Sequence, residues 1–284
     1  MWVSSQRVRP IDLMHLGHEH VICCWEADGL LIDPGPQSCE DTLLAAIGGE
    51  QPKALLLTHI HFDHAGAAGA LVRRWPDLPV YVHERGAKHL ADPARLVASA
   101  ARLYGGEDGL ARLWGEVVPV PEANLRILEG GETGVEGAFR VEYTPGHASH
   151  HVCYFHEEAG WAFVGDMAGV VVPPNPYTLA PTPPPDIDVE AWERSLATIA
   201  AWEPQTLALT HFGTSDDPPA QLEAVREALR WQADLAGAHD QETFMATLHQ
   251  RIAESGPEDV DEFETAAPLD HLFLGLDRWH RKRG

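Results

Sequence analysis

The sequence predicts an α/β fold in which two stacked mixed sheets lie between helix layers, with a helical addition at the C-terminus. Strand-like and helix-like segments alternate up to about residue 79, a pattern typical of partly parallel sheet. Strand-like segments return between residues 125 and 166, and only helix-like segments follow residue 218. We therefore expect a catalytic domain over residues 1–215 and a helical extension, residues 216–284, packed on it.

The first half contains short apolar runs punctuated by turn signals. Residues 20–36, "HVICCWEADGLLIDPGP", predict two strands joined by a turn at residues 27–29. The elements expected next are a helix at 41–49, a strand at 53–59, a helix at 65–76, a strand at 78–84 and a helical stretch near 94–114.

The second half begins with the strand-like segments "LRILEGGETG" and "FRVEYTPGH", then a hairpin in "CYFHEEAGWAFVGD" with its turn at residues 158–160. The Pro-rich segment 171–188 predicts a stiff, extended loop. Asp188 is expected to cap the following helix, and "TLALTHFG" predicts one more buried strand. The remaining expected helices span 219–236, 240–254 and 259–281, with a break near Pro268.

Composition excludes several functional classes. The 284 residues are 44% hydrophobic, and the sequence contains no apolar run of the about 18 residues needed to cross a membrane. The basic N-terminal segment lacks a following apolar stretch, so no secretory signal is expected. A net charge of −23 disfavours nucleic acid as a partner, because it repels the phosphate backbone. We expect a cytoplasmic protein acting on a small molecule, with four reduced cysteines and without a membrane partner; a homodimer is compatible with these features.

The stretch "ALLLTHIHFDHAGAAG", residues 54–69, concentrates metal-ligand residue types behind an aliphatic run. In an extended segment residues i and i+2 point the same way, so His59 and His61 can present two imidazoles side by side. Asp63 and His64 follow after the chain turns toward a helix starting near Ala65, and so face a neighbouring point. Imidazole and carboxylate ligands suit Zn²⁺, Fe or Mn²⁺.

Further ligand types occur at the ends of other expected strands. His147 lies in "YTPGHASHH", Asp166 in "FVGDM" and His211 in "LALTHFG", each after an apolar run. Residues in such positions meet if all of these strands open onto one edge of the fold. The sequence thus predicts that distant segments complete a metal site begun at His59.

The motifs HxHxDH, TPGH, VGD and THFG, preceded by IDPGP, occur in an order that resembles the metallo-β-lactamase superfamily, and within it the glyoxalase II-like hydrolases. The segment "VYVHERGAKHLADPARLVASAARLYG" is similar, more narrowly, to a bacterial and archaeal branch of that group. The resemblance covers residues 10–215. It implies a four-layer αβ/βα sandwich with a dinuclear site along one edge.

The resemblance also implies roles for individual residues. The first metal would be bound by His59, His61 and His147, the second by Asp63, His64 and His211, and both by the bridging carboxylate of Asp166. Asp63 and Asp166 would also contribute to catalysis. Asp33 and His151 would support the ligands from behind. The residues expected to contact substrate are His18 or His20 in the first flap and Tyr177 in the proline loop.

Two divalent metal ions, Zn first and Fe or Mn as alternatives, would activate a bridging hydroxide. This chemistry suits a small ester, thioester or lactone. The tyrosine that quorum-signal lactonases carry three residues after the bridging aspartate is Gly169 here, which disfavours that specialised activity. Two alternatives stay open at this point: a mononuclear iron persulfide dioxygenase, and a metal-binding scaffold without catalysis.

Overall fold

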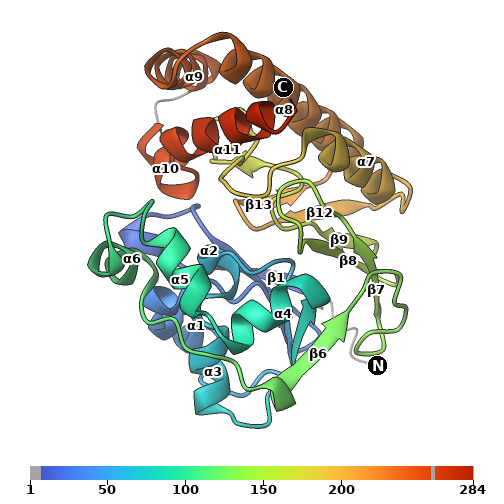
Figure 1. Cartoon of the computed structure of the whole chain (residues 1–284). Helices are drawn as coiled ribbons and strands as arrows, with labels where there is room; N and C mark the ends of the chain where they lie inside the picture. The colour runs from blue at the N-terminus through green and yellow to red at the C-terminus, as the bar shows by residue number, and fades with distance from the viewer. Residues whose placement is uncertain (1–7, 257–259, 284) are drawn as a thin grey trace.

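The computed structural model describes residues 8–256 and 260–283 and shows an α/β sandwich (Figure 1). A six-stranded sheet has the order β1-β2-β3-β4-β5-β6, and a five-stranded sheet has the order β13-β12-β9-β8-β7. The strands of the first sheet are β1 (Val8–Asp12), β2 (Cys23–Ala27), β3 (Leu30–Ile32), β4 (Leu55–Leu56), β5 (Val80–His83) and β6 (Leu125–Leu128). Those of the second are β7 (Phe139–Tyr143), β8 (Val152–His156), β9 (Trp161–Phe163), β12 (Thr206–Leu209) and β13 (Gly213–Ser215).

Both sheets are mixed, as predicted. In the first sheet β1, β2 and β3 pair antiparallel, whereas β3, β4, β5 and β6 pair parallel. In the second, β12 pairs parallel with β9 and antiparallel with β13, while β7, β8 and β9 are antiparallel neighbours. The parallel pairs bring the ends of β3, β4, β9 and β12 to one edge of the sandwich, where polar side chains gather.

The helices cover the outer faces of the two sheets. Those of the first half are α1 (Glu40–Ala46), α2 (Phe62–Ala65), α3 (Ala68–Arg74), α4 (Glu84–Ala91), α5 (Ala94–Ala100) and α6 (Glu107–Trp114). Those of the second half are α7 (Val189–Ala200), α8 (Pro218–Ala238), α9 (Gln241–Ser255), α10 (Val260–Ala266) and α11 (Leu269–Arg281). In Figure 1 the first group lies in the lower half of the molecule, and α7–α11 lie above it.

Alternation along the strands explains the layers. Trp25 and Leu56 point into the cluster between the sheets, while Cys24 and Leu55 point into the cluster under the first helix layer. On β12, Ala208 likewise faces the space between the sheets, and its neighbours face α7 and α8. Because both faces of these strands are buried, their sequences are continuous apolar runs rather than alternating ones.

The C-terminal helices share one hydrophobic cluster with the outer face of the second sheet. Leu229 of α8, Phe244 of α9 and Leu276 of α11 are fully buried in the same cluster as Val164 and Leu207. The extension predicted from residue 216 onward is therefore helical and packs on the sandwich. The expected boundary between two domains at residue 215 stays a prediction.

Several details differ from the sequence prediction. Strand β1 and helix α4 were not predicted, and the expected helix over 94–114 is two helices, α5 and α6, separated by Gly105 and Gly106. The proline segment is not wholly loop, because β10 (Val170–Val171) and β11 (Thr178–Leu179) form a small antiparallel pair within it. Asp188 caps α7 as predicted, accepting a hydrogen bond from the Ala191 amide at 2.9 Å. Within the described residues, no helix is both long and apolar enough to span a membrane.

Candidate metal centre

The loop after β4 begins the centre. Strand β4 ends at Leu56, and His59 and His61 follow outside the sheet, with extended backbone at His61. The next helix begins earlier than the predicted Ala65, because Asp63 and His64 already lie within the four-residue helix α2. The ligand atoms of Asp63 and His64 fall into a separate group from those of His59 and His61, although the His59 and His64 rings are neighbours with centroids 4.0 Å apart. The expected division of the motif into two halves thus has a backbone cause.

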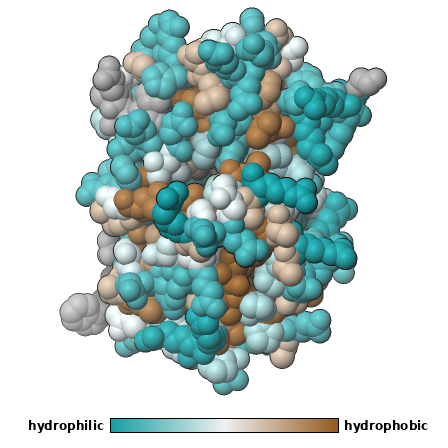
Figure 2. All heavy atoms as spheres, turned by 60° about the vertical axis from the view of Figure 1, so that its left-hand side comes forward, coloured by the Kyte–Doolittle hydropathy of each residue, from teal (hydrophilic) through white to brown (hydrophobic). Residues whose placement is uncertain are grey.

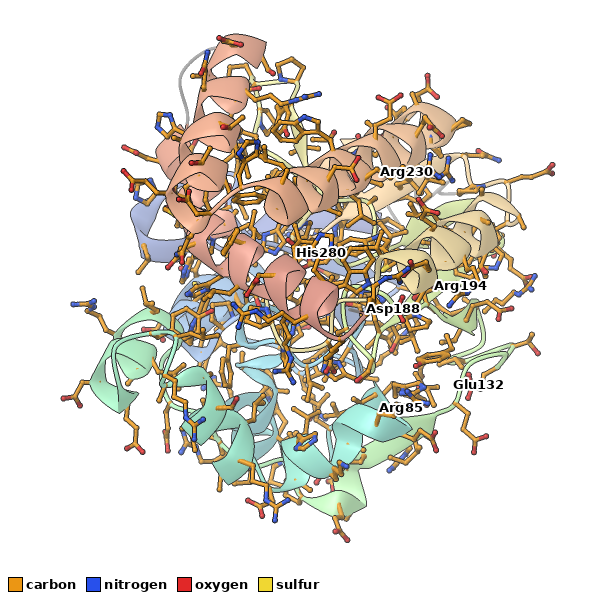
Figure 3. The ribbon with its side chains drawn as sticks, turned by 45° about the horizontal axis from the view of Figure 1, so that its top comes forward. Arg85, Glu132, Asp188, Arg194, Arg230 and His280 are labelled. Atoms are coloured by element: carbon orange, nitrogen blue, oxygen red, sulfur yellow. The ribbon has the colours of Figure 1, made fainter. Side chains whose placement is uncertain are left out.

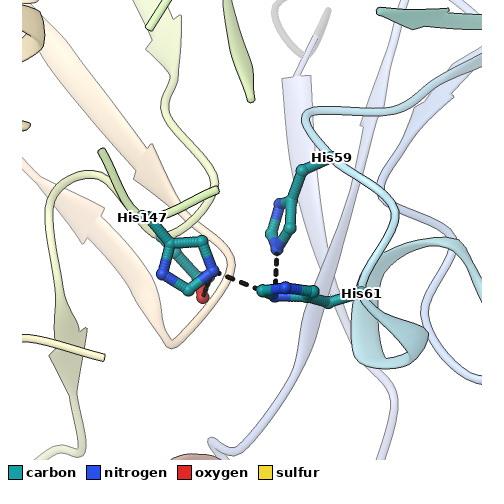
Figure 4. A group of neighbouring side chains, drawn as sticks. His59, His61 and His147 are labelled. Atoms are coloured by element: carbon teal, nitrogen blue, oxygen red, sulfur yellow. Dashed lines mark hydrogen bonds and ion pairs between the residues drawn. The ribbon is translucent and has the colours of Figure 1, made fainter. Parts of the chain in front are cut away.

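The first group contains His59, His61, His147 and Asp166, whose ligand atoms all lie within 4.8 Å of one another. The Nδ1 atom of His61 lies 2.9 Å from His59 Nε2 and 3.0 Å from His147 Nε2, as Figure 4 shows. The Asp166 Oδ2 atom lies 3.1 Å from His147 Nε2. The structure therefore brings together the four side chains that the sequence assigned to the first metal.

The second group contains Asp63, His64 and His211. The Oδ2 atom of Asp63 lies 3.7 Å from His64 Nε2 and 3.4 Å from His211 Nε2. Asp166 joins this group through its other oxygen, Oδ1, at 3.0 Å from His64 Nε2 and 3.5 Å from His211 Nε2. One carboxylate thus directs a separate oxygen atom at each group.

Hydrogen bonds on the outer side of the imidazoles fix which nitrogen faces inward. His147 Nδ1 donates to the Pro181 carbonyl at 2.8 Å, and His211 Nδ1 donates to the Val21 carbonyl at 2.6 Å. His64 Nδ1 donates to Asp33 Oδ2 at 2.8 Å. Since a carbonyl or carboxylate oxygen only accepts, the inward Nε2 of each neutral ring carries a lone pair. Such outer partners are typical of metal-binding histidines.

Asp33 organises the back of the centre. Its buried carboxylate accepts hydrogen bonds from the Thr58 amide at 2.8 Å, the Thr58 hydroxyl at 2.7 Å and the Thr210 hydroxyl at 3.1 Å, in addition to His64. It therefore ties the strand ends after β3, β4 and β12 together. This is the hydrogen-bonding position that the sequence prediction gave to Asp33.

His151 supports the centre in a different way from Asp33. Its Nδ1 lies 3.0 Å from the Thr144 hydroxyl, and its ring stacks on that of His59 with centroids 5.0 Å apart. It thus contacts a ligand ring by packing rather than by a hydrogen bond. The space beside it admits only glycine at position 165, because a Cβ there would lie 2.7 Å from His151 Nε2 and 2.6 Å from Thr58 Oγ1. The glycine of the VGD motif is thus a packing requirement of the centre.

The donor set fits divalent metal ions. Among the described residues, His64 Nε2 and Asp166 Oδ1 are buried without a hydrogen-bond partner, although they lie 3.0 Å apart. In the first group, His61 Nδ1 can donate to at most one of the two ring nitrogens that face it. Buried polar atoms without partners are costly, so a cation between these atoms accounts for their arrangement.

Electrostatics distinguishes the two groups. Burial, and then the neighbouring His147, lower the pKa of His61 to about 4, and burial likewise keeps the pKa of His59 well below its usual range. In His64 burial is outweighed by the carboxylates of Asp166 and Asp63, which raise its pKa. The first group therefore presents neutral imidazoles, and the second is dominated by carboxylate charge.

A cavity of about 460 Å³ opens in front of the two groups. His61, Asp63 and Asp166 form part of its wall, and residues of α4, α5, the proline segment, α10 and α11 form much of the rest. The C-terminal helices therefore shape the cavity, through residues 266–268, His271 and Leu272. Figure 2 shows hydrophobic side chains gathered between the upper and lower parts of one face, with hydrophilic side chains beside them.

The three residues expected to contact substrate are not among those lining this cavity. His18 lies 3.5 Å from Glu262, His20 packs on Phe212, and Tyr177 packs on Phe263. Their contact with a substrate stays a prediction. Sequence reasoning missed residues that do line the cavity, among them His150 and His89. The i, i+3, i+4 spacing of Arg85, Lys88 and His89 was the available signal, but helix α4 had not been predicted.

A family comparison agrees with this geometry. The family model described as "Metallo-beta-lactamase superfamily" matches residues 26–211, a range that contains both groups of ligand residues. The chain belongs to the metallo-β-lactamase superfamily. The expected membership and α/β fold are thereby confirmed.

Two curated members of the superfamily illustrate the similarity. The probable metallo-hydrolase YqgX of Bacillus subtilis is 33% identical over 140 residues, which cover 49% of this chain and 60% of that protein. The hydroxyacylglutathione hydrolase of Xanthomonas euvesicatoria is 34% identical over 164 residues, 56% of this chain and 50% of that protein. The chain thus spans less than two thirds of the length of these relatives.

Solved structures of the superfamily match nearly the whole chain. The archaeal protein ST1585 from Sulfolobus tokodaii has a TM-score of 0.69 at 21% identity, covering 95% of this chain and 97% of its own. The protein TTHA1429 from Thermus thermophilus has a TM-score of 0.68 at 21% identity, covering 98% and 94%. At this identity the likeness establishes the fold, and it includes the C-terminal helices.

Proposed function

We propose that this protein is a dinuclear metal-dependent hydrolase that cleaves a small ester, thioester or lactone. The observation that carries the proposal is the position of Asp166, with Oδ2 directed at His147 and Oδ1 at His64 and His211. A carboxylate so placed can bridge two cations. Zn²⁺ is the first choice for these ligands, and Fe or Mn²⁺ are compatible with them.

When bound, two divalent cations supply a water nucleophile at neutral pH and stabilise negative charge on the carbonyl oxygen. Hydrolysis forms a bond from the water oxygen to the acyl carbon, breaks the bond to the alcohol or thiol, and leaves that group protonated. His61, Asp63 and Asp166 lie on the cavity wall, so an acyl carbonyl can reach this part of the centre. In its neutral form each of these imidazoles has its lone pair on the inward nitrogen, because its outer nitrogen donates to a fixed partner.

The test is metal analysis and turnover of protein prepared without chelators. We expect two metal ions per chain and release of free thiol from a short acyl thioester. Asp166→Asn should lose about a hundredfold or more of this activity and bind fewer metal ions, because it removes the bridging charge. Asp77→Asn, a substitution of an exposed aspartate outside the centre, is the matched control and should change neither reading.

Three results would contradict the proposal in whole or in part. One iron per chain with oxygen uptake on a glutathione persulfide would establish the dioxygenase alternative. Full metal loading without turnover of ester, thioester and lactone substrates would favour a scaffold without catalysis. Retention of full activity by Asp166→Asn would refute the bridging role even if hydrolysis were observed.

A further inference from the structure

The wall of the cavity also contains three cationic residues. Arg85 and Lys88 of α4 and Arg95 of α5 line it, and we refer to these three residues as the basic wall. Residues 85 and 88 are three apart on one helix and therefore lie on the same face. Arg85 is labelled on α4 in Figure 3. In a chain with a net charge of −23, such a concentration of cations at one cavity is unexpected.

In the part of the chain that the structure describes, the basic wall has no acidic salt-bridge partner. Arg73, Arg140 and Arg230 pair with glutamates within 4.0 Å, as do other arginines of the surface. Within residues 8–256 and 260–283, no salt bridge involves the three cations of the basic wall. The Arg85 guanidinium instead lies over the Tyr143 ring, 5.4 Å from its centroid. The charges are therefore free to bind an anion from solution.

Acidic groups near the basic wall are few. Apart from Asp63 and Asp166, which belong to the metal centre, the acidic residue lining the cavity is Asp186, whose Oδ2 accepts a hydrogen bond from the Ser149 hydroxyl. The pKa of His89, which lies on α4 beside the wall, is lowered first by burial and then by the charges of Lys88 and Arg95, which outweigh the opposite effect of Asp186 and Asp92. The field on this side of the cavity is thus positive.

The remaining lining is largely apolar and lies deeper. Leu96, Leu103 and Tyr104 are half-buried, and Trp114 and Leu272 are buried. The three cations of the basic wall, by contrast, are exposed. A ligand of this cavity would therefore place a charged part at the mouth and an apolar part inside. The metal-binding groups would meet the bond between these two parts.

We propose that the basic wall binds a carboxylate or phosphate carried by the alcohol or thiol half of the substrate, while the apolar lining holds the acyl half. The inference rests on the proposed hydrolase function and narrows its substrate class to amphiphilic, anionic esters or thioesters. Arg85, Lys88 and Arg95 then determine specificity by binding the leaving-group half. They do not take part in bond cleavage.

The test compares substrates that differ by one charge. The hexanoyl thioesters of N-acetylcysteine and of N-acetylcysteamine differ by a single carboxylate, and hexanoyl-coenzyme A supplies phosphates instead. We expect kcat/KM to be about tenfold higher for the anionic thioesters than for the neutral one, with each of the three cations contributing about twofold. This preference should weaken at high salt, which screens exposed charges. The coenzyme A arm distinguishes phosphate from carboxylate as the preferred anion.

Substitution of the three cations by alanine should abolish the preference by raising KM for the anionic thioesters, with kcat and neutral-thioester turnover little changed. The matched control removes three exposed arginines that do not line the cavity, in the variant Arg102→Ala, Arg112→Ala, Arg194→Ala. Arg194 lies on α7, apart from Arg85 in Figure 3. The control changes the net charge by the same amount but should retain the preference, because its three arginines lie outside the cavity lining.

A binding experiment separates this inference from the proposed function. The thioether S-hexyl-N-acetylcysteine cannot be hydrolysed, and calorimetry should show it binding about tenfold more tightly than S-hexyl-N-acetylcysteamine. If the two thioethers bound equally well, or if the alanine variant kept the preference of the parent protein, the proposed role of the basic wall would be wrong even if hydrolysis is observed. A stronger preference for an anion on the acyl half, tested with the glutaryl thioester of N-acetylcysteamine, would also overturn it. Binding preference without any turnover would refute the hydrolase and leave the wall as an anion site.

Discussion

The metal centre and the basic wall of the cavity are built in contrasting ways. In the centre, the outer nitrogens of His64, His147 and His211 each have a fixed hydrogen-bond partner, and the side chains are buried. On the wall, Arg85, Lys88 and Arg95 are exposed and have no carboxylate partner among the described residues. The contrast teaches that one side is preorganised for a fixed chemistry, while the other is free to select a ligand.

The largest expected effect follows from removing the support of the centre. Asp33→Ala leaves the Thr58 amide and His64 Nδ1 buried without acceptors. We expect the free energy of unfolding to fall by about 3 kcal/mol and metal affinity to fall about 10-fold to 100-fold. Denaturant titration and metal titration measure the two quantities.

Thr210→Val is the milder comparison, because it removes only one of the hydrogen bonds that Asp33 accepts. It should lower the free energy of unfolding by about 1 kcal/mol and leave both metal ions bound. If Asp33→Ala bound metal as tightly as the parent protein, preorganisation would not distinguish the centre from the wall.

A smaller effect is expected on the apolar part of the wall. Leu103→Ala widens the cavity and removes contact with an acyl chain, so the advantage of a hexanoyl over an acetyl thioester should fall about tenfold. The ratio of kcat/KM for the two substrates measures it. Leu113→Ala, on α6 but outside the lining, should leave the ratio unchanged. An unchanged ratio in Leu103→Ala would show that the acyl chain binds elsewhere.

The smallest effect concerns His15, which lies between the two regions. Its ring stacks on that of Trp114, which lines the cavity, with ring centroids 4.9 Å apart. Burial lowers the pKa of His15 to about 4. In the unfolded chain His15 has a pKa near 6.5 and therefore binds a proton more tightly than in the folded protein. The free energy of unfolding is therefore highest above pH 6.5, where His15 is neutral in both states, and it decreases as the pH falls to 4.

His15→Phe preserves the stacking and removes the titration. The free energy of unfolding of both metal-free proteins should decrease from pH 6.5 to pH 4. We expect the decrease to be about 1 to 3 kcal/mol smaller for His15→Phe than for the parent protein. His239→Gln, which replaces an exposed histidine, is the control variant. If the free energy of unfolding had the same dependence on pH in His15→Phe and in the parent protein, His15 would not contribute to the pH dependence of stability.

Much of the centre could be predicted from the sequence because its residues lie in short motifs at strand ends. The spacing of His59, His61, Asp63 and His64 is local, so a single loop already carries its geometry. The wall could not be predicted in the same way. Helix α4 has few apolar residues and escaped prediction, and Arg85 acquires its role only from the cavity that it faces.

The first flap also shows that residue type alone did not predict the contacts of a side chain. Its histidines attracted attention through residue type, yet His18 lies near Glu262 of α10, and His20 packs on Phe212. Residue type alone does not state the direction of a side chain in an irregular segment. At His20 the backbone has a positive φ of 63°, which no local pattern announces.

By itself the sequence determined the α/β layers and the division of the HxHxDH motif, because burial on both strand faces and i, i+2 spacing are local consequences of the chain. The full ligand sets were implied by the family resemblance. Only the tertiary structure decided that Asp166 directs one oxygen at each set, and that α10 and α11 close a cavity against α4 and α5. These features join segments more than a hundred residues apart. Their geometry depends on how the layers pack, which no short stretch of sequence encodes.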